Sequence, residues 1–302
     1  MRRHVRAVRG TYALLLIGLV SAPVACGRFG NADNTKEGRR LVSVSKQHTE
    51  ILYAIGAEKD LVAVDVSSVY PPATRQLPTV GYHRALSLEG MLAAKPTLLI
   101  TGGRNNMGPE PVVQQIEALK IPTAEFAASG SDLESTKALI REMGTYFQQE
   151  SRADSVVKTL EADMARALSR ESAPVDTPSV VIIHYGRANN TYLTILGKSV
   201  AGQMVRWAGG RMALPDSAGM RQLTSPEIIA KADPDVILLT DFGYDRLAGL
   251  SDVLALPGVG STKAARNGRI YRVEENDLVY FGPRTGRNVE ALRALLHPAP
   301  GS

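Results

Sequence analysis

Short apolar stretches alternate with helical patterns along most of the chain. Apolar runs typical of buried strands occupy residues 41–44, 61–66, 97–101, 179–184, 235–240 and 269–273. Helical spacing appears between them, at residues 51–55, 86–94, 111–119, 199–208 and 226–232. Strands separated by helices are typical of α/β domains with a mostly parallel sheet. The pattern therefore predicts two α/β lobes, over residues 41–130 and 175–298.

Residues 131–174, between the predicted lobes, follow a different pattern. Apolar side chains recur at helical spacing from Leu133 to Leu168, and no proline interrupts them. We predict one long helix that connects the two lobes. Two helices broken near Gly144 or Glu150 are the alternative, because the segment is long for a globular helix.

The two predicted lobes also share a sequence pattern. Glu89 starts a helix that leads to Pro96 and an apolar strand, and Glu227 starts one that leads to Pro234 and another strand. A second pair of similar helices, at residues 50–56 and 203–209, occurs in the same order. The repetition predicts two similar lobes with a ligand cleft between them, where small molecules commonly bind.

The first 25 residues have the three parts of an export signal. Basic residues end at Arg9, an apolar run follows at residues 12–20, and small residues lead to Cys26. Cys26 is the only cysteine, so no internal disulfide is possible. The small residues before it resemble a lipoprotein cleavage site, which predicts a lipid anchor on Cys26 and a flexible tether over residues 26–40; simple secretion is the alternative.

Charge and composition exclude two broad classes of function. The net charge of +5 comes largely from four arginines in the predicted signal, and its removal leaves 31 basic against 30 acidic residues. No basic stripe remains that would indicate nucleic-acid binding. The sequence also lacks a nucleophile elbow, a phosphate loop and a zinc-spaced cluster of histidines and cysteines. We therefore expect a binding protein rather than an enzyme.

One segment of the sequence carries a family resemblance. Residues 81–90 read Gly-Tyr-His-Arg-Ala-Leu-Ser-Leu-Glu-Gly, and residues 281–285 read Phe-Gly-Pro-Arg-Thr. Both segments resemble the haem-binding members of a class of substrate-binding proteins that also serves vitamin B12 and siderophore importers. Weaker matches lie at residues 49–52, 69–71, 108–109 and 256–259. The resemblance runs from about residue 41 to 298 and implies an exported protein that delivers haem to the permease of an ABC importer.

The resemblance implies an iron ligand. In that family the tyrosine of the Gly-Tyr segment binds haem iron, which places the role on Tyr82. Phenolate is a hard donor suited to ferric iron, and Arg84 would favour the anion if alternation placed it on the same side. The same alternation would turn His83 away, towards the surface. A half-buried loop tyrosine is the alternative for Tyr82.

Other residues are candidates for the remaining contacts. His184, at the end of a predicted strand, is a candidate second axial ligand, and Tyr244 with Arg246 repeats the Tyr-x-Arg spacing. Arg104 and Lys198 are candidate partners of the haem propionates. In related importers one glutamate on each lobe docks onto the permease, which implies Glu89 and Glu227, although both also suit the first turn of a helix. A ferric-siderophore or cobalamin binder is the alternative function, and a haem scavenger without a permease is a third.

Overall fold

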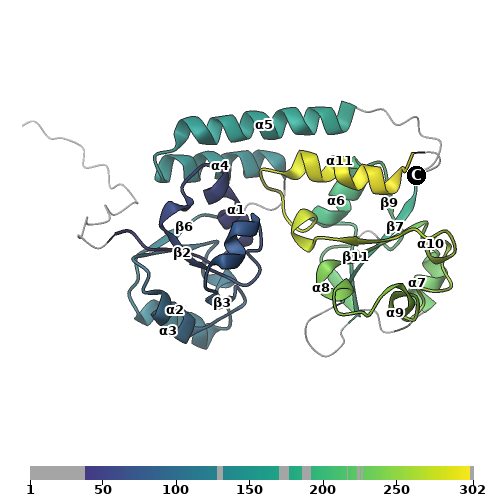
Figure 1. Ribbon diagram of the computed structural model, residues 1–302, viewed down its shortest axis with the longest axis horizontal. Coiled ribbons are helices and arrows are strands. Elements are labelled where there is room, and N and C mark those ends of the chain that lie inside the picture. Colours follow the sequence, from purple (N-terminus) through teal and green to yellow (C-terminus); the bar gives the residue numbers. More distant parts are fainter. Residues whose placement is uncertain are drawn as a thin grey trace, which may run out of the picture. The chain divides into compact units, whose positions relative to one another are not determined.

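The computed structural model describes residues 38–127, 132–169, 177–185, 192–215, 217–222, 225 and 227–299. These residues belong to one compact unit, which runs from Glu37 to Ser302. The predicted signal, Cys26 and most of the predicted tether lie outside the described residues. Two separate β-sheets, each covered by helices, form the two lobes (Figure 1). The predicted fold class of two α/β lobes is confirmed.

The first lobe contains a four-stranded parallel sheet. Its strands β1 (Leu41–Ser43), β2 (Leu61–Val64), β5 (Leu98–Thr101) and β6 (Thr123–Glu125) have the order β2-β1-β5-β6. Helices α1 (Lys46–Ala54), α2 (Leu88–Ala94) and α3 (Glu110–Ala118) accompany them, with a small hairpin of β3 (Gly81–Tyr82) and β4 (Ala85–Leu86). Successive residues of a strand enter different cores, because Leu41 packs on one face and Val42 on the other. Burial on both faces explains the continuous apolar runs.

The second lobe has a mixed sheet. Strands β7 (Ser179–Tyr185), β11 (Val236–Thr240) and β12 (Ile270–Val273) pair in parallel, whereas β8 (Tyr192–Ile195) and β10 (Met220–Gln222) extend the sheet antiparallel beyond β7. The short β9 (Arg211–Met212) pairs in parallel with the start of β7. Its helices are α6 (Val200–Trp207), α7 (Glu227–Ala232), α8 (Asp241–Tyr244), α9 (Leu250–Leu254), α10 (Lys263–Arg266) and α11 (Thr285–Leu296).

The order of elements bears out the internal repeat. In the first lobe β1 is followed by α1, β2, α2 and β5, and β1 pairs with both β2 and β5. In the second lobe β7 is followed by α6, β9, α7 and β11, and β7 pairs with both β9 and β11. The β8 and β10 strands are additions within this shared plan. Their short runs carry no apolar alternation strong enough to predict them.

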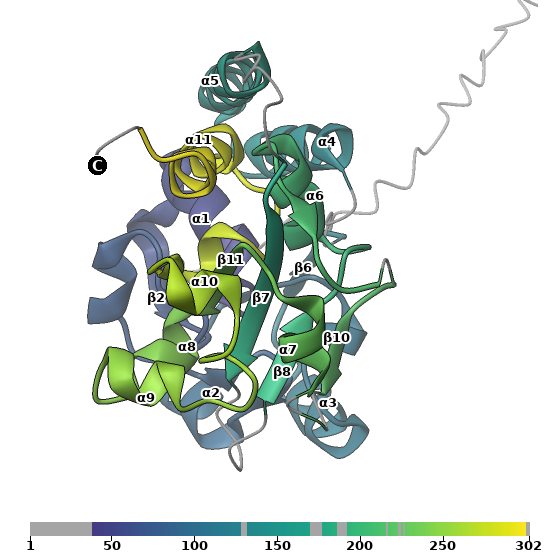
Figure 2. The same ribbon diagram turned by 90° about the vertical axis from the view of Figure 1, so that its right-hand side faces the viewer.

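The connecting segment is not one long helix, as we predicted, but two. Helix α4 (Leu133–Tyr146) ends before Gln148, whose φ of 56° is left-handed, and α5 (Glu150–Ser169) starts just beyond it. The alternative, two helices with a break near Glu150, is what the structure has, because a single left-handed residue breaks a helix without any proline. Looking along α5, Figure 2 shows α4 and α11 beneath it.

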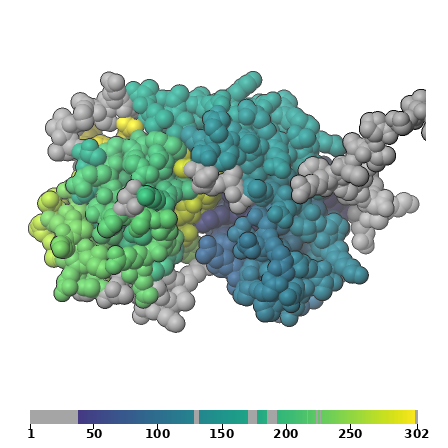
Figure 3. All heavy atoms as spheres, turned by 180° about the vertical axis from the view of Figure 1, so that it is seen from behind, coloured from purple at the N-terminus to yellow at the C-terminus, as the bar shows by residue number. Residues whose placement is uncertain are grey.

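Two glycines allow α5 to pack closely against α4 and α11. A Cβ at Gly144 of α4 would lie 2.4 Å from the Cβ of Ala153 of α5. A Cβ at Gly286 of α11 would lie 2.5 Å from the backbone carbon of Asp163, further along α5. Helix α5 therefore packs on both halves, and the teal surface in Figure 3 crosses above them. No helix within the described ranges is both long and apolar enough to cross a membrane.

Buried polar contacts also join the lobes, at what we call the interlobe joint: Gln47, Glu50, Asp277, Tyr280, Phe281 and Arg284. Arg284 donates to both carboxylate oxygens of Glu50, at 3.1 Å each, and to Asp277 at 2.6 Å. Tyr280 donates its hydroxyl to Glu50, and Gln47 donates to the Phe281 carbonyl at 2.7 Å. The sequence segments at 49–52 and 281–285, which carried part of the resemblance, therefore meet each other across the lobes.

Candidate functional site

The Tyr82 side chain stands on a tight hairpin. Gly81 has a φ of 90°, and a Cβ there would come within 2.8 Å of the Ser87 nitrogen, so only glycine fits this position. His83 and Arg84 form the turn between β3 and β4. Tyr82 is 40% exposed, an unusual degree for a large aromatic side chain. The hairpin thus presents a phenol on a backbone that has little freedom to move.

His83 does not point away from Tyr82, as strand alternation predicted. The two rings lie 4.1 Å apart between centroids, at an interplanar angle of 52°. The side chain of His83 is only 19% exposed, because it folds inward onto Asp65. Alternation fails here because His83 is a turn residue and not part of a strand. Arg84 is exposed at the turn beside them.

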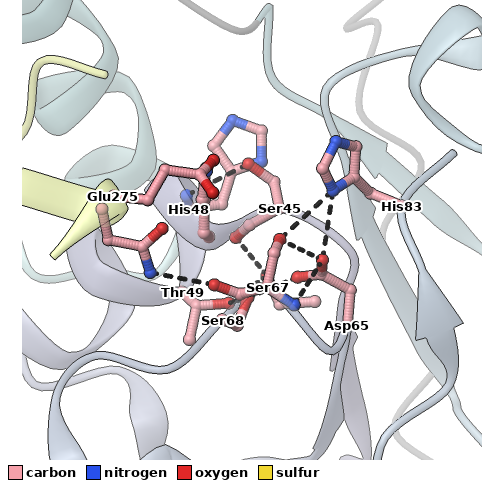
Figure 4. Close-up of polar contacts among 11 residues, drawn as sticks. Ser45, His48, Thr49, Asp65, Ser67, Ser68, His83 and Glu275 are labelled. Atoms are coloured by element: carbon pink, nitrogen blue, oxygen red, sulfur yellow. Dashed lines mark hydrogen bonds and ion pairs between the residues drawn. The ribbon is translucent and has the colours of Figure 1, made fainter. Parts of the chain in front are cut away.

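A buried carboxylate holds His83 in this position. Asp65 directly follows β2 and is fully buried, and its Oδ2 lies 3.2 Å from Nδ1 of His83. The same carboxylate accepts from the Ser67 backbone nitrogen at 3.1 Å, from the Ser67 hydroxyl, and from the Ser68 hydroxyl at 2.5 Å. We call Asp65, Ser67, Ser68 and His83 the Asp65 cluster (Figure 4). Burial alone would raise the pKa of Asp65, but the hydrogen bonds from His83, Ser67 and Ser68 outweigh it and lower the pKa.

The second lobe places His184 near the end of β7. Its Nδ1 lies 3.1 Å from the Thr240 hydroxyl and 3.6 Å from a carboxylate oxygen of Glu275, and the side chain is 16% exposed. Glu275 also pairs with Lys46 of the first lobe at 3.2 Å. The next residue, Asn276, donates to the Ser67 carbonyl at 2.9 Å. A continuous path of contacts therefore runs from His184 through residues 275–276 to the Asp65 cluster.

The other candidate ligands have different surroundings. Arg104 is exposed, but Glu110 and Glu117 of α3 hold its guanidinium, so it would have to exchange a carboxylate to bind a propionate. Lys198 is exposed. Tyr244 is half-buried and packs against the core beneath α7 and α9, and Arg272 binds the neighbouring Asp245 at 2.6 Å. Tyr82 is therefore the more exposed phenol of the two candidates.

Both candidate docking glutamates are exposed in the first turn of equivalent helices. Glu89 lies in the first turn of α2, which Ser87 caps by accepting from the Gly90 nitrogen at 3.1 Å. Glu227 begins α7 and accepts from the Ser225 hydroxyl at 3.0 Å. Figure 1 shows α2 and α7 on the side of the lobes away from α5.

Sequence reasoning missed the residues that support the site. Asp65, Ser67 and Ser68 follow a buried strand directly, and Glu275 and Asn276 follow β12. Polar residues just beyond the carboxyl ends of parallel strands are a usable signal for a binding site. That signal was present in the sequence, but the partner of each side chain lies far away along the chain.

Comparison with known proteins places this arrangement in a family. Residues 41–276 match the family described as periplasmic binding protein. An uncharacterized ABC transporter substrate-binding lipoprotein of Bacillus subtilis is 26% identical over 282 residues, which cover 91% of this chain and 86% of the relative. A vitamin B12-binding protein of Pectobacterium atrosepticum is 25% identical over 67% of this chain and 71% of the relative.

A solved structure gives the same fold at higher identity. The periplasmic heme-binding protein RhuT of Roseiflexus sp. RS-1, in its apo form, is 32% identical with a TM-score of 0.76. The match covers 85% of this chain and 97% of the other. The two lobes, their shared order of elements and these matches lead to one conclusion: the chain belongs to the periplasmic binding protein family and is an exported ABC-type substrate-binding protein, not an enzyme.

Proposed function

We propose that this protein captures ferric haem between its two lobes and delivers it to the permease of an ABC importer. The observation that carries the proposal is Tyr82, an exposed phenol on a constrained hairpin, backed by the buried Asp65 cluster. The similarity to a haem-binding protein at 32% identity supports it. The protein's part is to bind and orient the cargo, since the porphyrin itself supplies most of the iron's ligands.

The chemistry of Tyr82 suits ferric haem. A phenol has a pKa near 10 and loses its proton when its oxygen binds ferric iron, which is a hard cation. Arg84, two residues further along in the turn of the same hairpin, is the proposed cation that favours the phenolate. His184 of the second lobe is the candidate ligand on the opposite side of the porphyrin. Of the two candidate partners of the propionates, Lys198 is exposed, whereas Arg104 would have to leave Glu110 and Glu117.

Absorption spectroscopy with purified protein tests this function. Ferric haem should give a tyrosinate spectrum, and Tyr82→Phe should remove its charge-transfer band and weaken binding at least about tenfold, while keeping the ring packing on His83. Tyr244→Phe is the matched control, and it should leave the spectrum unchanged. A wild-type spectrum in Tyr82→Phe would show that the iron is bound elsewhere.

Cobalamin is the second candidate, because vitamin B12-binding proteins match two thirds of the chain. The cobalt of cobalamin already carries its ring and axial ligands, so that cargo gives Tyr82 no metal to bind. A titration with cyanocobalamin under the same conditions separates the two cargoes. Tight cobalamin binding that survives Tyr82→Phe, together with weak haem binding, would favour this alternative.

Glu89 and Glu227 are proposed to dock onto cationic residues of the permease. Two separated charges on equivalent helices would fix the orientation of the binding protein and steer its association. Replacing both with alanine should abolish permease-dependent haem uptake and leave the haem spectrum intact. Uptake at the wild-type rate would mean that both are ordinary residues of a helix's first turn.

Cys26 is proposed to carry a lipid that holds the protein at the outer face of the cytoplasmic membrane. The Bacillus subtilis relative is described as a lipoprotein, and the residues before Cys26 are small. Cys26→Ser should move the protein from the membrane fraction to the soluble exported fraction. A wild-type protein that is wholly soluble would exclude the anchor.

A further inference from the structure

The Asp65 cluster has the geometry of a metal-ligating histidine and its supporting carboxylate. Nδ1 of His83 lies 3.2 Å from both Oδ2 of Asp65 and the Ser67 hydroxyl oxygen. The Ser67 hydroxyl donates its proton to Asp65, and a carboxylate can only accept, so Nδ1 of His83 carries the proton in this arrangement. In the neutral ring this leaves a lone pair on Nε2. Figure 4 shows the second ring nitrogen of His83 pointing away from Asp65 and Ser67. Histidine ligands of metals almost always have such a carboxylate or carbonyl partner on their other nitrogen.

The position of His83 relates this nitrogen to the iron site. Its ring lies 4.1 Å from that of Tyr82, so the two side chains offer an oxygen and a nitrogen donor from the same hairpin turn. One axial position of a haem iron takes only one of them at a time. The oxidation state distinguishes them, because phenolate suits the harder ferric ion whereas neutral imidazole is a good ligand for ferrous iron.

We propose that His83 is an alternative axial ligand of the haem, taken by the iron when it is ferrous. This inference rests on the proposed function. A one-electron reductant converts ferric to ferrous iron, the Tyr82 oxygen leaves the metal and takes up one proton from solvent, and Nε2 of His83 forms the new bond. Asp65 is a positioning residue, since it holds the ring and increases the electron density on Nε2 without touching the haem.

The protein would consequently retain its cargo in both oxidation states. On the face of the haem that Tyr82 approaches, a phenolate alone would bind ferrous iron poorly. The buried carboxylate matters because His83 belongs to a two-residue turn, where an unsupported side chain would sample several rotamers. Three hydrogen bonds from Ser67 and Ser68 fix the carboxylate in turn.

The test compares haem binding before and after reduction with dithionite under anaerobic conditions. Reduced wild-type protein should show an imidazole-ligated ferrous spectrum with an iron–histidine stretching band in resonance Raman. His83→Gln should lose that band and weaken ferrous binding at least about tenfold more than ferric binding. Asp65→Asn should keep the band but shift it to lower frequency, because the imidazole loses its anionic partner.

Two control variants make the outcome decisive. His297→Gln changes a histidine at the end of α11 and should leave the band in place, and His184→Gln identifies the other possible imidazole ligand. The inference is wrong if the ferrous band survives His83→Gln or disappears only in His184→Gln. Failure of the wild type to bind ferric haem at all would instead overturn the proposed function, so the two failures are distinguishable.

Discussion

The two lobes each place a histidine beside a carboxylate at the end of a strand, but they hold it differently. In the first lobe His83 bonds to Asp65, which is fully buried and accepts three further hydrogen bonds. In the second lobe His184 bonds to a threonine hydroxyl, and its carboxylate neighbour Glu275 lies 3.6 Å away and pairs with Lys46 of the first lobe. One histidine is fixed within its own lobe, and the other is tied to a contact between lobes.

The difference indicates that the two lobes have different roles in binding. The first lobe offers preorganised donors, since the Asp65 cluster needs nothing from the second lobe except the Asn276 hydrogen bond to the Ser67 carbonyl. The second lobe offers a histidine whose surroundings depend on how the lobes meet. We expect haem to bind first to the Tyr82 side and to engage His184 only when residues 275–276 stay in contact with the first lobe.

Breaking the interlobe joint should have the largest effect. Arg284→Ala leaves the buried Glu50 without its cation, which should cost about 3–5 kcal/mol in the free energy of unfolding. Arg287→Ala is the matched control, because that side chain is 59% exposed and its partner Asp163 keeps Arg166; we expect at most about 1 kcal/mol. Urea denaturation measures both. Equal losses would show that the Glu50 pair is no stronger than a surface pair.

His48, the other histidine of the first lobe, sharpens the contrast, because its ring nitrogens have no hydrogen-bond partner among the described residues. Burial lowers its pKa from 6.5 to about 4. As pH falls from 6.5 towards 4, His48 becomes protonated in the unfolded chain but stays neutral in the folded protein. The free energy of unfolding therefore falls by up to about 3 kcal/mol. His48→Leu should remove this loss. The measurement is the free energy of unfolding of the wild type and of His48→Leu at several pH values between 6.5 and 4. The same pH dependence in both proteins would contradict the prediction.

Neutralising the carboxylates of the His83–Asp65 and His184–Glu275 pairs should have smaller effects on stability than the two changes above. Asp65→Asn replaces an acceptor of four hydrogen bonds with a group that is partly a donor, so we expect a loss of about 1.5–3 kcal/mol. Glu275→Gln keeps an oxygen for Lys46 and should cost less than about 1 kcal/mol. Thermal or urea unfolding gives both values. If Glu275→Gln lowered the free energy of unfolding more than Asp65→Asn, the first lobe would not be the preorganised one.

The sequence by itself determined the two-lobe α/β plan, the internal repeat and the segment that carries Tyr82. Strands such as β5 and β11 are buried on both faces, and this burial requires apolar runs that are visible in one dimension. Short-range patterns also placed α2, α3, α6 and α7 within about two residues of their observed bounds, but they predicted no helix at residues 285–296, where α11 lies. They offered a break near Gly144 or Glu150 only as the alternative to one long helix, because the left-handed residue Gln148 ends a helix without a proline signal.

Only the tertiary structure decided which side chains meet. Asp65 and His83 are 18 residues apart, and Glu50 and Arg284 are 234 apart, so neither pair has a local pattern. Alternation predicted that His83 faces away from Tyr82, and the turn between β3 and β4 brings the two rings together instead. Periodicity encodes which face of an element is buried. The partner of a buried polar group is chosen by the packing of distant elements, since its hydrogen bonds must be satisfied wherever the fold places it.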